Sequence, residues 1–245
     1  MREKEMIFGI RAVIEAAEAG KNIDKVLVRR ELQGELFKEL QEVLRRYEIP
    51  MQRVPVERIE RITRKNHQGV IAFTSAVAYQ KLEDIIPFLY EEGKNPLIVV
   101  LDGITDVRNF GAIARTCEVA GVDAIVIPER GSVSVNADAI KTSAGALHTI
   151  PVCRERNLKD AILFLRNSGV KVVAATEKAA DNYTAVDLTS PTAIVMGSED
   201  EGVSNEIIRI CDNLVKIPQF GNIQSLNVSV ACGVMIYEVV RQRGI

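Results

Sequence analysis

The spacing of apolar residues divides the chain into a shorter first part and a longer second part. In the first part, apolar residues recur at helical spacing over residues 9–19 and 32–47, and a short helix is expected at 56–63. Strands are expected at 25–28, 51–54 and 70–78. These elements predict a compact α/β unit over residues 1–78.

The second part alternates continuous apolar runs with helical patterns. Strands are expected at 97–101, 124–127, 149–152, 170–175, 193–196 and 214–217, and helices at 109–120, 137–146, 158–167, 205–211 and 225–241. Uninterrupted apolar strands are typical of a parallel sheet covered on both faces. We therefore expect a larger α/β domain at 96–245. Residues 79–95, with a helix at 82–90 and a turn containing Gly and Pro, are the expected linker.

Composition narrows the class of protein without naming a function. The 245 residues are 47% hydrophobic and 26% charged, which is ordinary for a globular protein. The charged start does not resemble a signal peptide, and the longest apolar region, 226–240, is shorter than the ~20 residues that span a bilayer. We expect a cytoplasmic protein with no membrane role.

Cysteine and histidine give little support to a metal site. The four cysteines show no close pairs, and the two histidines stand far apart in sequence. Four reduced cysteines in a cytosolic core are the simpler interpretation.

Charge differs between the two parts of the chain. The net charge of −2 combines about +3 over residues 1–80 with about −5 over residues 81–245. The first part is therefore the better candidate for contact with phosphate.

Three loops after expected strands carry the candidate chemistry, because ligands of open parallel sheets gather beyond the carboxyl ends of strands. They cover residues 102–109, 197–202 and 218–227. In the first, Asn109 is placed to cap a helix, and Arg115 lies off the apolar stripe of that helix, where it is either an ordinary exposed side chain or a phosphate ligand.

The other two loops are open to more than one interpretation. The acids of the second loop suit a solvated turn, a weak cation site or hydrogen-bond acceptors for a ligand. In the third, Ser225 is placed to cap a helix that is apolar on almost every face and needs cover, from the core and also from a second subunit. Asn227 and Ser229 then need polar partners.

Fingerprints of several nucleotide enzymes are missing. No Gly-x-Gly-x-x-Gly follows a strand, and neither a P-loop nor a Gly-x-Ser-x-Gly elbow is present. A nucleotide-dependent oxidoreductase is therefore disfavoured.

Taken in order, the three loops resemble the motifs of the SpoU/TrmH branch of SPOUT RNA 2′-O-ribose methyltransferases. Asp-x-x-x-Asp-x-x-Asn-x-Gly-Ala-x-x-Arg occurs as Asp102 to Arg115, Gly-Ser-Glu-x-x-Gly as Gly197 to Gly202, and Ile-Pro through Ser-Leu-Asn-Val-Ser as Ile217 to Ser229. The first part of the chain, with His67-Gln68-Gly69-Val70, resembles the family's small RNA-binding domain, which is similar to certain ribosomal proteins. Val107 departs from the family, where many members have Pro.

The resemblance implies the architecture and the reaction. It implies a C-terminal SPOUT domain with a deep trefoil knot, a homodimer with its active site at the subunit interface, and S-adenosylmethionine as cofactor. The architecture is similar to that of the bacterial enzyme that methylates a guanosine in the peptidyl-transferase P-loop of 23S ribosomal RNA. Alternatives are a transfer-RNA 2′-O-methyltransferase and a non-catalytic RNA-binding protein of the same fold.

The resemblance also implies roles for individual residues. The backbone around Gly197, Ile217 and Leu226 would hold the cofactor. The catalytic set would be Asn109, Arg115, Glu199, Ser225 and Asn227. The resemblance places Arg115 at the ribose and its phosphate, either as a phosphate anchor or as the proton acceptor. Arginine is a poor base because its pKa exceeds ~12, so phosphate anchoring and charge stabilisation are the favoured role, and the proton acceptor stays open. The N-terminal unit would contact RNA through Arg58, Arg61, Arg64, Lys65 and His67.

Overall fold

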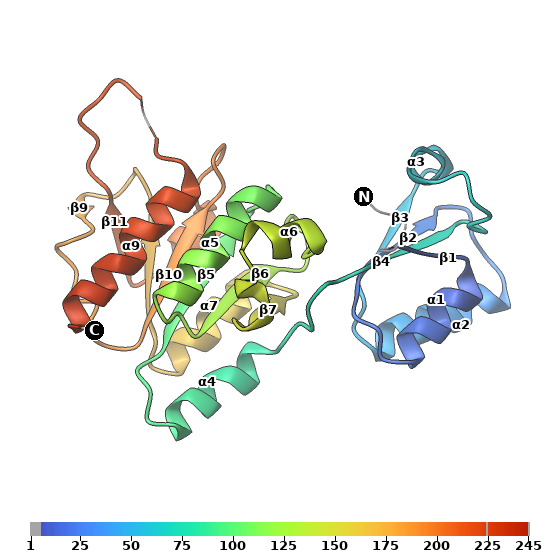
Figure 1. Ribbon diagram of the computed structural model, residues 1–245, viewed down its shortest axis with the longest axis horizontal. Coiled ribbons are helices and arrows are strands. Elements are labelled where there is room, and N and C mark those ends of the chain that lie inside the picture. Colours follow the sequence, from blue (N-terminus) through green and yellow to red (C-terminus); the bar gives the residue numbers. More distant parts are fainter. Residues whose placement is uncertain (1–5, 224, 245) are drawn as a thin grey trace. The chain divides into compact units, whose positions relative to one another are not determined.

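The computed structural model describes residues 6–223 and 225–244 and forms two compact units (Figure 1). Unit 1 comprises Met1–Ala78 and Ser134–Asn136, and unit 2 comprises Tyr79–Val133 and Ala137–Ile245. No described helix is long and apolar enough to cross a membrane.

Unit 1 is a four-stranded sheet with helices on both faces. The strand order is β1-β4-β2-β3, formed by Met6–Phe8, Val70–Thr74, Ile23–Arg29 and Met51–Val54. Alternate strand residues face opposite sides. Helices α1 (Ile10–Glu18) and α2 (Glu35–Arg46) pack on the side of Val26 and Val28, whereas α3 (Val56–Ile62) packs through Ile59 on the side of Leu27.

Unit 2 contains the expected parallel sheet, with seven strands in the order β7-β6-β5-β10-β8-β11-β9. Every adjacent pair is parallel. The strands are Val152–Glu155, Ala124–Pro128, Leu97–Asp102, Thr192–Gly197, Lys171–Ala175, Asn213–Lys216 and Asp181–Asn182, in that order. The α/β fold with a parallel sheet is confirmed.

Helices cover both faces of this sheet. One face packs against α4 (Leu82–Glu91), α7 (Leu158–Asn167) and α8 (Asn205–Ile208). Three more helices are α5 (Val107–Val119), α6 (Ala137–Thr142) and α9 (Val228–Arg243), of which α5 contacts both others, and a short 3₁₀ helix spans Ala146–His148. Helix α4 lies in the stretch expected as a linker and buries Leu82, Ile86 and Leu89 in the core of unit 2.

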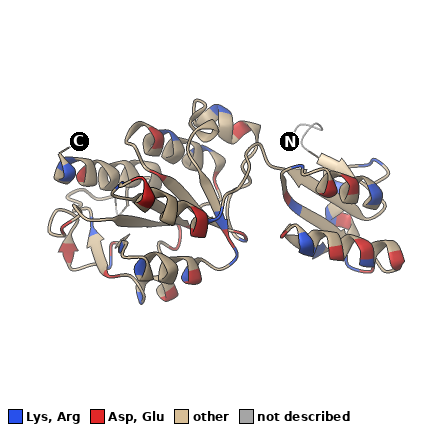
Figure 2. Ribbon diagram, turned by 90° about the horizontal axis from the view of Figure 1, so that it is seen from below, with Lys and Arg blue, Asp and Glu red and all other residues tan. Residues whose placement is uncertain are grey.

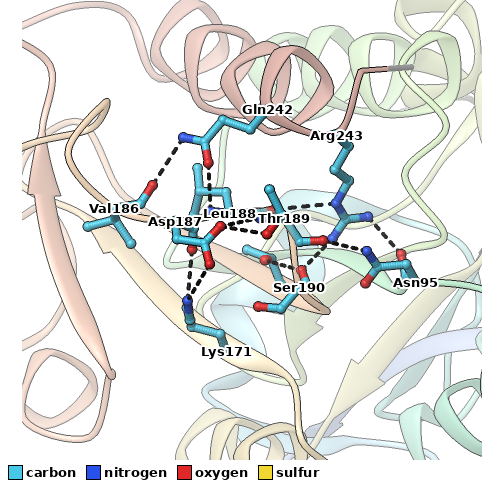
Figure 3. A network of polar contacts seen from close by, with 10 residues as sticks. Asn95, Lys171, Val186, Asp187, Leu188, Thr189, Ser190, Gln242 and Arg243 are labelled. Atoms are coloured by element: carbon cyan, nitrogen blue, oxygen red, sulfur yellow. Dashed lines mark hydrogen bonds and ion pairs between the residues drawn. The ribbon is translucent and has the colours of Figure 1, made fainter.

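The last turn of α9 is tied to the segment before β10 (Figure 3). The Arg243 guanidinium donates to the carbonyl oxygens of Asn95 at 2.7 Å, Ser190 at 2.8 Å and Pro96 at 3.1 Å. Gln242 donates to the Val186 carbonyl at 3.0 Å and accepts from the Leu188 N–H at 2.8 Å. These bonds hold the carboxyl end of α9 against the start of the central strands.

Candidate active site

The first two loops begin side by side because their strands are neighbours. Strand β10 pairs in parallel with β5, with Gly197 opposite Asp102, so both loops leave the same edge of the sheet. An Asp102 carboxylate oxygen accepts the Ser204 backbone N–H at 2.8 Å. This bond joins the end of β5 to the end of the second loop.

Three side chains from the three loops meet in one hydrogen-bond network. The Asn109 amide donates to Glu199 Oε1 at 2.9 Å, and the Asn227 amide donates to the same oxygen at 2.7 Å. Asn227 Nδ2 also donates to Asn109 Oδ1 at 3.0 Å. Residues separated by up to 118 positions in sequence thus form a single polar cluster.

The caps of the two helices at this cluster differ from the sequence predictions. Helix α5 begins at Val107, and Asp106 is its N-cap because the carboxylate accepts the N–H groups of Arg108 and Asn109, both at 2.8 Å. Asn109 therefore lies in the first turn, and its predicted capping role was wrong. Helix α9 is capped by Asn227, so the prediction for Ser225 was also wrong.

The oxygen of the Asn227 amide caps helix α9, and its NH₂ group joins the polar cluster. Its Oδ1 accepts the backbone N–H of Ser229 at 2.9 Å and the Ser229 hydroxyl at 2.5 Å. The expectation that these two polar residues need partners is confirmed. Capping satisfies a backbone donor at the helix start and also fixes the direction of the amide.

Gly197 is required by the close packing of the second loop. A Cβ on Gly197 would lie 2.0 Å from the Gly202 carbonyl carbon and from the Val203 nitrogen. The loop folds back on itself, with the Gly202 N–H donating to the Ser198 carbonyl at 2.9 Å. Gly202 itself has φ +68°, which favours glycine. Close packing at Gly197 and the positive φ of Gly202 thus explain why the motif has glycine at both positions.

A cavity of about 330 Å³ opens beside the cluster. The predicted cofactor residues Gly197, Ile217 and Leu226 line it, together with Glu199 and Ser225. Gln224 of the third loop lies outside the described residues. Among the described lining residues there are four carboxylates and no basic side chain: Glu177, Glu199, Asp200 and Glu201. The cavity therefore favours a ligand with positive charge.

Two of the predicted catalytic residues are not part of this network: Ser225 lines the cavity, and Arg115 belongs to neither the network nor the cavity. The Arg115 side chain is exposed, and no hydrogen bond or ion pair to another described residue holds it. Six residues after Asn109 on α5, it points about 120° away around the helix axis. Within one chain, Arg115 and the cluster lie on different sides of α5.

One protein-family profile matches the part of the chain that contains all three loops. The profile described as "SpoU rRNA Methylase family" matches residues 96–237, more than half of the chain. The chain belongs to the SpoU rRNA methylase family. A second profile, "RNA 2'-O ribose methyltransferase substrate binding", matches residues 6–80.

Similar proteins cover this SpoU-family chain almost completely. A TrmH family tRNA/rRNA methyltransferase of Staphylococcus saprophyticus is 34% identical over 98% of this chain and 97% of its own. YacO of Bacillus subtilis, which is also named a TrmH family tRNA/rRNA methyltransferase, is 32% identical over 99% of this chain and 97% of its own. The AdoMet-bound rRNA methyltransferase of Sinorhizobium meliloti is 28% identical, covers 97% of this chain and 87% of its own, and has a TM-score of 0.62.

The substrate-binding domain of this family member carries a hollow of about 730 Å³. Arg61, Arg64 and His67 line it together with Glu57 and Glu60. Arg58 and Lys65 do not line this hollow, and the Lys65 ammonium lies 5.5 Å from the centre of the Phe8 ring. Figure 2 shows that basic and acidic positions occur together on the helices of each unit.

His67 belongs to the turn that leads into β4. Its Nδ1 accepts the Gly69 N–H at 2.9 Å. Gln68 and Gly69 have φ of +48° and +80°. The His-Gln-Gly sequence thus forms a tight turn with one ring nitrogen already engaged.

Sequence reasoning missed two polar lining residues at the end of β8. Thr176 and Glu177 line the cavity together with the motif loops. The signal was present, because both residues follow an expected buried strand, and strand ends at one edge of a parallel sheet meet there.

Proposed function

We propose that this chain transfers a methyl group from S-adenosylmethionine to a ribose 2′-hydroxyl of RNA. The observation that carries the proposal is the Asn109–Glu199–Asn227 network at the edge of an acidic cavity. The first candidate target is a guanosine in the peptidyl-transferase P-loop of 23S ribosomal RNA. The organisation of the chain, with a substrate-binding profile followed by the SpoU profile, supports this target.

The cavity suits this cofactor in size and in charge. Its volume lies at the lower end of the ~300–1,000 Å³ typical of ligand sites. Met196, Ile217 and Leu226 offer apolar contact to an adenine ring, and the carboxylates favour a sulfonium and an ammonium group. The same carboxylates disfavour the phosphates of a dinucleotide. The S. meliloti relative is described as bound to AdoMet.

The residues of the chain have separate roles in this proposal. When bound, the cofactor supplies a methyl group activated by positive sulfur. The backbone around Gly197, Ile217 and Leu226 holds its adenosine part, while Ser225, Asn109 and Asn227 order the site. Arg115 anchors the phosphate beside the target ribose, since its guanidinium stays charged and offers a planar fork to phosphate oxygens.

We further propose that two copies of the chain form the working enzyme. Large apolar side chains are exposed on α5 and α9, with Val119 65%, Val230 53% and Tyr237 49% exposed. A second copy can cover these side chains, and its Arg115 can approach the cluster from outside. This arrangement accounts for an Arg115 that points away from the cluster of its own chain.

Unit 1 is proposed to dock the RNA. Arg58, Arg61, Arg64, Lys65 and His67 are its candidate contacts, since basic side chains bind phosphate and RNA loops offer unpaired bases to polar groups. The reaction needs no metal, and the described residues contain no group of three or more metal-binding side chains. We propose that the protein acts in the cytoplasm, because its candidate substrates are ribosomal and transfer RNA.

Labelled S-adenosylmethionine, incubated with the protein and unmodified 23S, 16S or transfer RNA, tests this proposal. The expected product is a 2′-O-methylguanosine in the 23S P-loop, mapped by mass spectrometry. Label in transfer RNA alone would retain the chemistry and correct the target, consistent with relatives named tRNA/rRNA methyltransferases. RNA binding without label in any RNA would favour the non-catalytic alternative. An Arg115→Ala variant should bind the cofactor but lose transfer.

A further inference from the structure

The two oxygens of Glu199 lie in different surroundings. Both amide groups of the cluster, from Asn109 and Asn227, donate to Oε1. No hydrogen bond from another described residue reaches Oε2, and the Glu199 side chain lines the cavity. One oxygen is thus used for orientation, and the other is available for chemistry.

The cluster fixes the direction of every amide in it. Asn227 must turn its oxygen toward the Ser229 N–H and hydroxyl, so its NH₂ group faces the other two members. Asn109 accepts one of these protons at Oδ1 and therefore points its own NH₂ group at Glu199. Glu199 Oε1 receives two donors and cannot itself donate there.

We propose that Glu199 Oε2 is the proton acceptor of the methyl transfer. This inference rests on the proposed function. The alternative base is Arg115, approaching from the second copy, but an arginine guanidinium is a poor proton acceptor at neutral pH. A carboxylate on the wall of the donor cavity is the better-placed acceptor.

The step balances in atoms and electrons. The ribose 2′-oxygen forms a bond to the methyl carbon while the carbon–sulfur bond breaks. The electron pair of that bond stays on sulfur, which becomes a neutral thioether. The hydroxyl proton passes to Glu199 Oε2 and leaves to water after product release. A positioned general base contributes about 10²- to 10⁴-fold in rate.

Glu199→Gln separates proton acceptance from orientation. The glutamine oxygen can take the place of Oε1 and accept both amide donors, so the cluster persists, while an NH₂ group replaces Oε2 and accepts no proton. We expect kcat to fall by about 100-fold or more. The Kd values for S-adenosylmethionine and for RNA, measured by calorimetry, should stay within about threefold. Glu206→Gln on α8, an exposed site, makes the same charge change and should leave kcat unaltered.

The outcomes decide between the possible roles. If Glu199→Gln keeps kcat within about threefold of the parent, Glu199 only orients the site and the inference is wrong. A tenfold or larger loss of cofactor affinity would instead assign Glu199 to donor binding and also overturn it. The parent protein is measured alongside: absence of transfer by the parent itself contradicts the proposed function, whereas transfer by parent and variant alike contradicts this inference alone.

Discussion

Gly197 is the residue whose substitution has the clearest steric consequence. In Gly197→Ala the new Cβ would meet backbone atoms of Gly202 and Val203 at 2.0 Å, and backbone cannot move aside as a flexible side chain does. The second loop must then open, which displaces the cavity wall. We expect a loss of cofactor affinity of at least 100-fold, a cost of about 2.7 kcal/mol, by calorimetry.

Gly221→Ala is the matched control for Gly197→Ala. Gly221 lies in the third loop, its φ is not positive, and an added Cβ would meet nothing within 4 Å. The affinity of the Gly221→Ala variant for the cofactor should equal that of the parent protein. Equal affinities of both variants and the parent would show that the second loop does not shape the site.

Cys153 predicts a dependence of stability on alkaline pH. Burial, and to a lesser degree the negative charges of Glu155 and Asp84, raise the pKa of this thiol from 9.0 to about 12. Because the folded state holds the proton more tightly, its contribution to stability is complete below pH 9 and is lost as pH rises from 9 toward 12.

Urea unfolding at pH 8 and at pH 10.5 tests this dependence. The contribution of Cys153 should fall by about 2 kcal/mol between the two, at 1.36 kcal/mol for each pH unit above the unfolded pKa. Cys153→Ala removes this titration, so its free energy of unfolding should fall by that much less over the same interval. An identical pH dependence in parent and variant would show that the thiol ionises as freely in the folded as in the unfolded state.

At the scale of elements, five helices begin at the expected residues, namely α3, α4, α6, α7 and α8, whereas β7 begins three residues after its expected start. Strands buried on both faces read as continuous apolar runs, so β5, β8 and β10 end within one residue of the expected positions. The start of α5 was harder to predict because Asp106 and Asn109 are both good capping residues. The choice depends on the turn after β5, which is a tertiary feature. Strands β1 and β9, of three and two residues, are too short to show periodicity.

The carboxyl end of α9 depends on Arg243. Its guanidinium donates to four backbone carbonyls, and burial lowers the pKa of this side chain. Arg243→Ala would remove a charged donor from four carbonyls, of which those of Pro96 and Ser190 keep a second donor from Thr192. We expect a loss of about 2–3 kcal/mol in the free energy of unfolding, measured in urea. Lys159→Ala, at an exposed position of α7, should change it by less than about 0.5 kcal/mol. Equal losses in the two variants would contradict this role of Arg243.

At the scale of the whole molecule, the motifs identified the site residues but not how they meet. Sequence spacing places Asn109, Glu199 and Asn227 in three loops. Their contact depends on β5 and β10 being neighbours and on α9 returning across the same edge. The position of Arg115 on a different side of α5 from Asn109 follows from their spacing of six residues once the segment is a helix. The trefoil knot implied by the family resemblance stays a prediction.

Coexpression of two inactive variants tests whether each active site combines residues from two copies of the chain. Arg115→Ala lacks the phosphate anchor, and Asn109→Ala lacks part of the cluster, so each alone should be inactive. If each site takes its Arg115 from the second copy, a mixed dimer has one site with both residues intact and one with neither. Random pairing makes half of the dimers mixed, so about a quarter of parental activity should return after the two variants are coexpressed.

The same mixture gives the opposite result if Arg115 serves its own chain. Both residues lie on α5, so no chain in the mixture would then carry a complete set, and no activity would return. Light scattering on each variant shows whether dimers form at all. A monomeric parent that methylates RNA would remove the second copy from the mechanism and require α5 to turn Arg115 toward its own cluster.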